Sequence, residues 1–308
     1  MEASVALKKV GKLAGEKTIL VDLTFGIEKG SLTAIIGAND AGKSTLMNVM
    51  AGLETPNYGA VYIDGLDLTK RRKEIRKEIG FIPMQTDLQS GMTLKENIHF
   101  IAHLYSIEKS DIEKRLMYYS GELDLSKVLD EYPGNLSTGI QKKAMLLRVL
   151  VLDSSVIFLD EPSAFLDPES ARQVWTILKN LQPDKTIVYT SQNLKDVEQN
   201  HDRILVLHEG KIILDGNLDK LLDSTLEYHQ FQLQLSEISD EIFSRVFDIP
   251  NIVSPKKQGN MILFFSRSKI AFLDVFNLID VNTVVNLDIK KLGLSDILDT
   301  HLSHKNQI

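Results

Sequence analysis

The stretch Gly37-Ala38-Asn39-Asp40-Ala41-Gly42-Lys43-Ser44-Thr45 decides the fold, because it has the spacing G-x-x-x-x-G-K-S of a phosphate-binding loop. An apolar run, Leu32–Ile36, precedes it, and a helix-like segment from Leu46 to Gly52 follows. Glycines let such a loop curl with its N–H groups facing inward, and the next helix adds its positive dipole end. Lys43 can then reach the β- and γ-phosphates, and the Ser44 hydroxyl can ligate Mg²⁺. All nine residues are therefore predicted to bind a nucleotide.

The composition describes a globular chain with an acidic balance. Its 308 residues, 43% hydrophobic and 25% charged, can form two domains with large cores. The net charge of −7 argues against a nucleic-acid partner, which normally requires a basic face. The lack of cysteine excludes disulfides and fits a reducing compartment. The N-terminus has no signal pattern and no apolar run could span a bilayer, so any membrane role requires a partner chain.

The N-terminal part is predicted to be rich in strands. Expected strands are Val5 to Val10, Thr18 to Phe25 and Leu32 to Ile36, with glycines such as Gly11 between them. Asp64-Gly65 predicts a hairpin turn.

The segment from Thr93 to Glu131 has a helical pattern, and Thr93 and Glu96 are spaced as a capping box. The basic run Lys70-Arg71-Arg72-Lys73 could bind an anion, but with acidic residues following it a solvated helix face is favoured.

A second apolar run, from Val156 to Leu159, ends in the carboxylates Asp160 and Glu161. A fully apolar strand indicates a sheet covered by helices on both faces, and such sheets bind ligands at the carboxyl ends of their strands. Asp160 is therefore predicted to hold Mg²⁺, and Glu161 to polarise the water that attacks the γ-phosphate. Alternatively, the two acids only cap the next helix. Further α/β elements follow: helix Pro168 to Leu181, strand Thr186 to Thr190, a helix from Leu194 and strand Arg203 to His208.

The pattern changes after a junction at residues 223–228. The expected order is β-α-β-β-α-β: His229 to Leu235, Ile238 to Phe247, Ile252 to Pro255, Met261 to Phe265, Ala271 to Ile279 and Val284 to Asp288, then a terminal helix from Ser295 to Leu302. This order predicts a small ferredoxin-like α+β domain at 229–308. It has no recognisable catalytic cluster, which indicates an interaction or regulatory role.

Three motifs together resemble the ATP-binding subunits of ABC transporters: the phosphate-binding loop, Leu136-Ser137-Thr138-Gly139-Ile140 as the signature motif, and Asp160-Glu161-Pro162-Ser163 as Walker B. Ala164 to Pro168 matches the D-loop. The resemblance implies a P-loop NTPase domain at 1–222, with a RecA-like α/β core, an antiparallel β subdomain and an α-helical signature subdomain at about 90–150. It also implies ATP and Mg²⁺ as cofactors.

In that family two such domains pair head to tail around two ATP molecules. The resemblance implies that residues 37–45 and Glu161 of one chain face Ser137, Thr138, Gly139 and Ile140 of another. ATP closes the dimer and hydrolysis opens it, which moves a separate membrane permease. The segment from Gln85 to Ile98 falls where the family contacts its permease. The chain is thus expected in the cytoplasm, at the inner face of the cell membrane.

Four positions depart from the family pattern. Asp40 stands where a glycine is usual, and its carboxylate repels phosphates. Met84 occupies the position of the glutamine that ligates Mg²⁺, with Gln85 one residue late as a substitute ligand. Gln192 replaces a histidine and can still donate a hydrogen bond to the γ-phosphate. No aromatic residue is present at 11–15 to stack on adenine.

Two mechanisms follow from these departures. A homodimer would hydrolyse ATP slowly at two weakened sites. In a heterodimer, this chain would hold ATP with little turnover while its Ser137 and Gly139 complete a competent site on the partner subunit; we favour this reading.

Leu292-Gly293-Leu294-Ser295-Asp296-Ile297-Leu298 resembles the end of bacterial drug- and antibiotic-peptide-exporter ATPases, which implies export. Methionine-type importers also append a ferredoxin-like domain, so import stays an alternative, as does an ATP-dependent switch or assembly factor without transport.

Overall fold

The computed structural model describes residues 3–223, 229–250, 252–266, 271–279, 281–290, 294–296 and 298. The chain divides into two compact units, Met1–Asp215 and Gly216–Ile308. Of the junction predicted at 223–228, Asp223 is the last residue of helix α8 (Leu218–Asp223), and residues 224–228 lie outside the described residues. So do Leu292, Gly293 and Ile297 of the C-terminal motif, and most of the terminal helix expected from Ser295. Within the described residues, no helix is both long and apolar enough to cross a bilayer.

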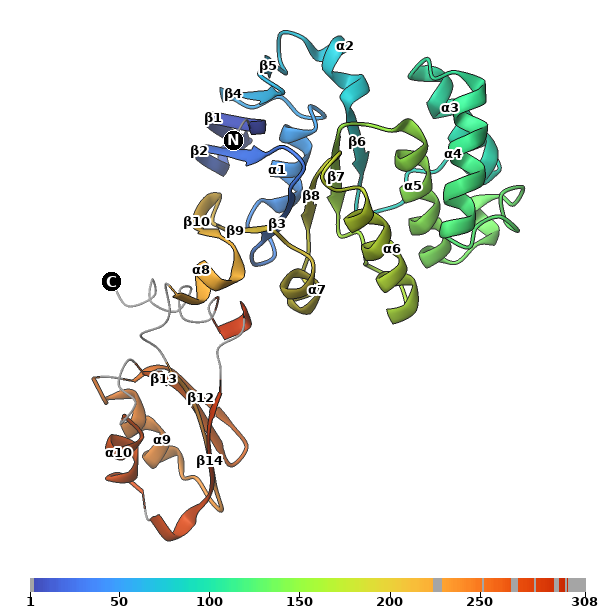
Figure 1. The fold of residues 1–308 in the computed structure, drawn as a ribbon. Coiled ribbons are helices and arrows are strands. Elements are labelled where there is room, and N and C mark those ends of the chain that lie inside the picture. The colour runs from blue at the N-terminus through green and yellow to red at the C-terminus, as the bar shows by residue number, and fades with distance from the viewer. Residues whose placement is uncertain are drawn as a thin grey trace. The chain divides into compact units, whose positions relative to one another are not determined.

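A six-stranded sheet forms the centre of the first unit, in the order β10-β9-β3-β8-β7-β6 (Figure 1). Its strands are β3 (Leu32–Ile36), β6 (Ile79–Ile82), β7 (Val156–Asp160), β8 (Thr186–Thr190), β9 (Arg203–His208) and β10 (Lys211–Gly216). The neighbours from β9 through β6 pair in parallel. β3, β7 and β8 are buried at every position, as a sheet covered on both faces requires. The phosphate-binding loop follows β3, at the carboxyl edge of this parallel sheet, which is the usual ligand position in such sheets.

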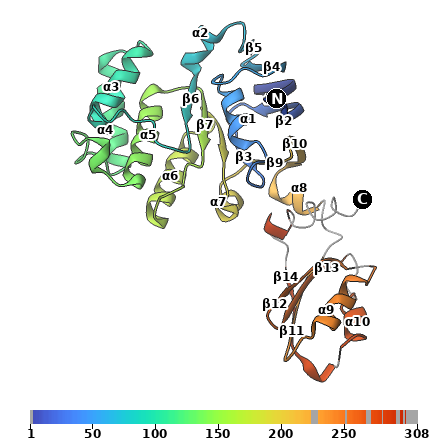
Figure 2. The same ribbon diagram turned by 180° about the vertical axis from the view of Figure 1, so that it is seen from behind.

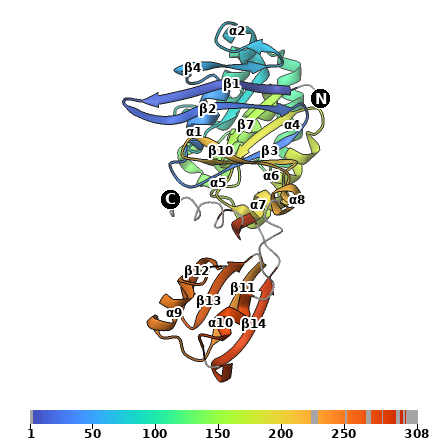
Figure 3. The ribbon, with the colours of Figure 1, turned by 90° about the vertical axis from the view of Figure 1, so that its left-hand side faces the viewer.

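A second sheet of the same unit is antiparallel, in the order β2-β1-β4-β5 (Figure 3). Its strands are β1 (Ala3–Ala14), β2 (Lys17–Glu28), β4 (Tyr58–Ile63) and β5 (Leu66–Asp67). Helix α1 (Lys43–Met50) lies between the two sheets (Figure 1). Its side chains Leu46 and Met47 share one buried cluster with Val5 of β1 and Phe158 of β7.

Two predictions about this sheet have different outcomes. The Asp64-Gly65 hairpin turn is confirmed, since Ile63 pairs with Leu66 across it. The expectation that Gly11 separates two elements is wrong, because β1 continues through Gly11 to Ala14. A glycine fits inside this strand because the Tyr58 ring crosses it, and a Cβ at Gly11 would lie 1.9 Å from that ring.

Helix α6 (Pro168–Asn180) covers the face of the parallel sheet opposite α1. On β8, Val188 belongs to the cluster around α1, whereas the ring of Tyr189 meets Trp175 of α6 at 4.7 Å between centroids. Successive residues of a strand face opposite sides, so the two helices lie on opposite faces. The short helix α7 (Leu194–Gln199) then leads into β9.

A group of helices lies beside β6, clear in both Figure 1 and Figure 2. It consists of α3 (Leu94–Leu104), α4 (Lys109–Glu122), η2 (Pro133–Asn135) and α5 (Thr138–Leu152). The capping box at Thr93 and Glu96 is confirmed, with both of its hydrogen bonds present. The basic run leads into α2 (Arg72–Ile75) and η1 (Arg76–Glu78), where Arg71, Arg72 and Lys73 are exposed.

The second unit holds a four-stranded sheet in the order β12-β13-β11-β14, with every pair antiparallel. Its elements are α8 (Leu218–Asp223), β11 (His229–Leu235), α9 (Asp240–Phe247), β12 (Val253–Gln258), β13 (Met261–Ser266), α10 (Ala271–Phe276), η3 (Val281–Thr283) and β14 (Val284–Lys290). Helices α9 and α10 cover one face of the sheet (Figures 1 and 3). The core is centred on Phe231 and Phe264, whose rings stack 4.9 Å apart.

Candidate nucleotide site

The loop between β3 and α1 takes a left-handed backbone at two positions. Gly42 has φ 101° and caps α1, which starts at Lys43. A Cβ at Gly42 would lie 3.1 Å from the Ile19 carbonyl, so both the angle and the space favour glycine. Asp40 has φ 63°, in a region that aspartate tolerates better than most residues.

The Lys43 ammonium lies inside the curl of the loop. It donates hydrogen bonds to the carbonyls of Gly37 and Ala38, each at 2.9 Å. Burial lowers its pKa, and the nearby carboxylates of Glu161, Asp160 and Asp40 partly oppose that shift. The ammonium thus donates to neutral backbone carbonyls. Anionic phosphate oxygens can replace these acceptors, because a hydrogen bond between two charged groups is stronger.

Thr190 at the end of β8 connects the two strand-end acids. Its hydroxyl donates to Asp160 Oδ1 at 2.5 Å and accepts from the Glu161 backbone N–H at 3.0 Å. Asp160 and Thr190 are register partners on adjacent parallel strands. Sequence reasoning missed Thr190; its signal was its position at the end of a buried strand, as for Asp160.

Glu161 has one occupied and one free carboxylate oxygen. Its backbone has φ 53°, and Oε2 accepts the backbone N–H of Gln192 at 3.2 Å. Oε1 is buried and has no hydrogen-bond partner among the residues that the structure describes, so it can accept a hydrogen bond from a water molecule. Burial raises the pKa of this carboxyl, and the neighbouring Asp160 charge adds to the shift, whereas the hydrogen bond from Gln192 opposes it. A raised pKa brings a carboxylate closer to the range of a general base.

These groups line a cleft of about 310 Å³. The predicted residues in its wall are Asn39, Asp40, Gly42, Lys43, Ser44, Thr45, Asp160, Glu161 and Gln192. Gly37, Ala38 and Ala41 belong to the loop but do not line the cleft, and neither does Gln85; its neighbour Met84 does. Lys17 and Ile19 of β2 complete the wall and were not predicted. The wall thus holds two lysines, two hydroxyls and three carboxylates. Lys43, the hydroxyls and the strand-end acids suit a magnesium nucleotide, with Ser44 and Asp160 as oxygen ligands for the metal.

Lys142 of α5 is a buried cation that the sequence did not reveal as part of the site. Its ammonium donates to the carbonyls of Asp160 at 2.9 Å, Pro83 at 3.0 Å and Met84 at 3.4 Å. Burial lowers its pKa to about 8, against the opposing charges of Asp160, Glu161 and Asp87. Lys142 therefore joins the helical group, the loop after β6 and the end of β7.

The signature residues lie elsewhere. Ser137 caps α5, its hydroxyl accepting from the Ile140 N–H at 3.3 Å, and both Ser137 and Thr138 are exposed. Gly139 lies against the backbone of Phe165, where a Cβ would come within 3.0 Å of the carbonyl oxygen. None of the residues from Ser137 to Ile140 lines the cleft of its own chain. Within one chain, the structure thus brings the loop and the strand-end acids together but not the signature motif.

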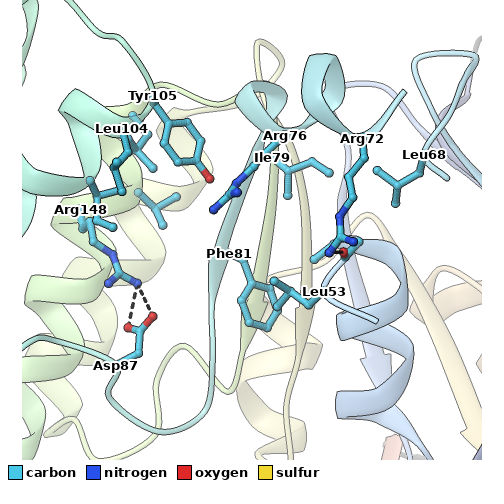
Figure 4. A pocket seen from close by; sticks show the side chains of 15 residues that line it. Leu53, Leu68, Arg72, Arg76, Ile79, Phe81, Asp87, Leu104, Tyr105 and Arg148 are labelled. Carbon is cyan, nitrogen blue, oxygen red and sulfur yellow. Dashed lines mark hydrogen bonds and ion pairs between the residues drawn. The ribbon is translucent and has the colours of Figure 1, made fainter. Parts of the chain in front are cut away.

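A second hollow of the same unit, here called the groove, lies between α2–η1 and the helices α3 and α5 (Figure 4). Its volume is about 280 Å³. Asp87 lies in its wall, only three residues after Met84 in the nucleotide cleft. Arg148 of α5 holds Asp87 through two hydrogen bonds of 2.8 and 3.0 Å. The segment from Pro83 to Asp87 therefore runs from the cleft to the groove, and α5 fastens it at both ends.

A phosphate-binding loop beside strand-end aspartate and glutamate defines a P-loop ATPase. Comparison with known proteins gives the family. The profile of the ABC transporter family matches residues 20–164. The ABC transporter ATP-binding protein NatA of Bacillus subtilis is 31% identical over 205 residues, 66% of this chain and 83% of that one. The chain therefore belongs to the ATP-binding subunits of ABC transporters: it is an ABC-type ATPase that binds ATP and supplies energy to a transporter.

Other relatives include both export and import proteins. The Nod factor export ATP-binding protein I of Neorhizobium galegae is 30% identical over 69% of this chain and 62% of its own length. The methionine import ATP-binding protein MetN of Haemophilus influenzae is 30% identical over 79% of this chain and 74% of its own. Among solved structures, a dimeric ATP-binding cassette, MJ0796, bound to ADP and Pi is similar with a TM-score of 0.65 and 26% identity, over 69% of this chain and 98% of that one.

Proposed function

We propose that this chain is one of two ATP-binding subunits in a bacterial exporter, and the one whose own cleft hydrolyses ATP more slowly; it is called the quieter subunit below. It pairs head to tail with a second ATP-binding subunit around two ATP molecules and drives a separate permease. Its own cleft holds ATP better than it cleaves it, while its signature residues complete the active cleft of the partner subunit. The observation that favours this assignment is the contrast between a cleft lined by Asp40 and Met84 and an intact signature motif whose Ser137 and Thr138 are exposed.

In its own cleft, residues 37–45 bind the phosphates, and Ser44 and Asp160 would hold the metal. The metal, when bound, neutralises phosphate charge. Glu161 orients a water through its free Oε1, and the Gln192 side chain donates a hydrogen bond toward the γ-phosphate. Gln85 would have to turn into the cleft to act as the metal ligand that Met84 cannot be. Asp40 adds a repulsion of about 1 kcal/mol at 4 Å in water, and more where water is excluded.

The partner's cleft would receive Ser137, Thr138, Gly139 and Ile140. The exposed start of α5 presents a hydroxyl and free N–H groups, which suit a phosphate supplied by another chain. The exposed Phe165 beside Gly139 supports including the D-loop in the same contact surface.

A permease would contact the groove, because the segment running from Met84 to Asp87 joins it to the nucleotide cleft. Such a contact places the chain at the cytoplasmic face of the membrane through its partner. The second unit has the strand order and antiparallel pairing of a ferredoxin-like domain, and we assign it a regulatory role. The functional boundaries we propose are 1–222 and 229–308.

Import is a second candidate, favoured by one observation. The alignment with the methionine import protein spans 256 residues, against 205 for NatA. A transport assay on inverted vesicles containing the reconstituted assembly separates the two, since exporters accumulate substrate inside such vesicles.

The test is co-purification from native membranes followed by ATPase assays. The purified chain is expected to show weak ATPase activity that rises when the second ATP-binding subunit is added. Ser137→Ala should lower the activity of the mixed assembly, whereas Glu161→Gln should leave most of it. Full activity of the chain alone would contradict the quieter-subunit assignment, and co-purification without any membrane protein would favour a non-transport switch.

A further inference from the structure

Thr190 is a buried polar side chain in the middle of the parallel sheet. It is 0% exposed, and its register partners on the two neighbouring strands are Ile35 of β3 and Asp160 of β7. A valine of nearly the same shape would suit this position in a buried strand, whereas a hydroxyl costs free energy there unless it is hydrogen-bonded. Packing alone therefore does not account for a threonine, and its hydrogen-bond partners do.

The two partners of the hydroxyl fix the direction of both hydrogen bonds. A carboxylate only accepts and a backbone N–H only donates, whereas a hydroxyl has one hydrogen to give and lone pairs that accept. The Thr190 hydrogen therefore goes to Asp160 Oδ1, at 2.5 Å, and the Thr190 oxygen accepts the backbone N–H of Glu161, at 3.0 Å. A single side-chain oxygen thus contacts both strand-end acids.

At Asp160, this bond determines which carboxylate oxygen is available to a ligand. A hydrogen bond from a hydroxyl to a carboxylate oxygen is short and strong, so the protein itself holds Oδ1. Oδ2 is then the oxygen left for a metal in the cleft that Asp160 lines. Outer-shell hydrogen bonds of this kind orient the side chains that ligate metals, and removing them weakens metal binding.

At Glu161, the bond holds an unusual backbone conformation. Glu161 has φ 53°, in the left-handed region that residues other than glycine rarely adopt, and such a conformation persists where the surroundings fix it. Thr190 holds the backbone N–H of Glu161, and the Gln192 N–H donates to its Oε2 at 3.2 Å. The end of β8 therefore holds Glu161 at both its backbone and its carboxylate.

We infer that Thr190 is a positioning residue of the ATPase reaction. Its hydroxyl sets the Asp160 carboxylate for the metal and the Glu161 backbone for the attacking water at the same time. Thr190 does not line the cleft, so it acts only through these two acids. The inference rests on the roles proposed for Asp160 and Glu161 and adds the group that ties one role to the other.

Thr190→Val in the full chain removes the hydroxyl and keeps the shape of the side chain. Electron paramagnetic resonance measures the affinity for Mn²⁺ in the complex with a non-hydrolysable ATP analogue, and this affinity should fall about 10- to 100-fold. Single-turnover phosphate release at saturating Mg²⁺ should fall about 10-fold or more. Thr190→Ser keeps the hydroxyl and should restore both values to within about 3-fold of the wild type.

Thr186→Val is the matched control on the same strand. Thr186 is 1% exposed, and its hydroxyl accepts the backbone N–H of Gly30 at 3.0 Å, at the end of β8 away from the acids. The control removes an equally buried hydroxyl and should change the Mn²⁺ affinity less than about 2-fold. Binding of the analogue without metal should be the same in all variants, which shows that the loop around Lys43 is folded.

Thr190→Cys supplies a second comparison if Thr190→Val does not fold. It differs from Thr190→Ser in one atom, and a thiol is a weaker donor and acceptor than a hydroxyl. Its Mn²⁺ affinity should therefore lie about 3-fold or more below that of Thr190→Ser. Equal affinities of these two variants would contradict the inference.

Three further results would overturn the inference. They are wild-type Mn²⁺ affinity in Thr190→Val, equal losses in Thr190→Val and Thr186→Val, and failure of Thr190→Ser to restore the affinity. Asp160→Asn separates this failure from that of the proposed site. If Asp160→Asn keeps the wild-type Mn²⁺ affinity, the proposed metal ligand is wrong. If only Asp160→Asn loses affinity, the ligand stands and the positioning role of Thr190 falls.

Discussion

The nucleotide cleft and the groove belong to one unit, yet they differ in whether their positive side chains lie near negative ones. In the cleft, Lys43 faces Asp160 and Glu161, so the protein supplies both signs. In the groove, Arg72 and Arg76 share a wall and have no acidic partner within the described residues. A small ligand that enters and leaves requires a site whose charged side chains keep their positions when the ligand is absent. A site for a protein partner can leave its charges to be neutralised on docking.

Removing the charge of Glu161 is expected to have the largest effect. Glu161→Gln keeps the shape of the side chain but not its ability to accept a proton, so hydrolysis by this chain should fall roughly 10²- to 10⁴-fold. Nucleotide affinity should change little. Single-turnover phosphate release measures the first effect, and Glu169→Gln, in the exposed first turn of α6, is the control. Unchanged hydrolysis would remove Glu161 from the mechanism.

The same residue predicts a pH dependence. Burial raises the pKa of Glu161 above the ordinary 4.5, and only the ionised form accepts a proton. Hydrolysis should therefore decline on acidification at a pH above the ordinary glutamate range. A decline centred at or below pH 4.5 would contradict the role of burial.

Lys142→Met tests the cleft end of the segment from Pro83 to Asp87. With a lowered pKa, Lys142 loses its proton near pH 8 in the folded chain, whereas the unfolded chain keeps that proton up to about pH 10.5. The unfolded state thus binds more protons between these values, so Lys142 makes the free energy of unfolding rise with pH there, by up to about 3 kcal/mol.

Urea unfolding at several pH values measures this rise, which Lys142→Met should remove. Arg148→Met is the matched control at the groove end, because a guanidinium stays protonated throughout this range. The same pH slope in wild type and Lys142→Met would show that Lys142 titrates as it does in the unfolded chain.

Lys43→Ala removes the cation of the phosphate-binding loop. The loss of charge-assisted hydrogen bonds to phosphate should weaken nucleotide binding by about 2 kcal/mol, roughly 10- to 100-fold. Titration with a fluorescent ATP analogue measures it. Arg76→Ala, in the groove, should leave this affinity unchanged. If Lys43→Ala binds nucleotide normally, the loop does not hold the phosphates.

Asp40→Asn should have the smallest effect, in the opposite direction. It keeps a side chain that tolerates φ 63° and removes a negative charge beside the phosphates, so ATP should bind about 5-fold tighter, near 1 kcal/mol. Asp22→Asn is the control, since Asp22 is exposed on β2 with a similar φ of 49° and lies outside the cleft. Equal gains in both variants would assign the effect to general electrostatics.

The sequence predicted the features that depend on a local residue pattern, such as strand bounds and a helix cap. The strands β3, β8, β9 and β11 have the predicted bounds, because each is an apolar or alternating run between turn residues. The capping box at Thr93 follows from a fixed spacing of two residue types. The prediction that Gly11 separates two elements was wrong because its place inside β1 depends on the Tyr58 ring of another strand.

The parts of the site that the sequence did not reveal depend on register and burial. Thr190 meets Asp160 only because β7 and β8 pair in one register. In the sequence, Lys142 cannot be distinguished from the neighbouring lysine on the same helix. Only the structure shows that its ammonium donates to three backbone carbonyls. Arg72 belongs to the basic run that is predicted to be a solvated helix face, and only the fold shows that it also lines an apolar hollow.

The short segment from Met84 to Asp87 has a thermodynamic consequence. Asp87 is three residues after Met84, a distance of at most about 10 Å along the chain. A displacement of this segment at the cleft therefore also displaces it at the groove. If nucleotide changes the affinity of the groove for its partner by some factor, the partner must change the affinity for nucleotide by the same factor. A docked partner would then act as an effector of ATP binding, and the occupancy of the cleft would report whether a transporter is assembled.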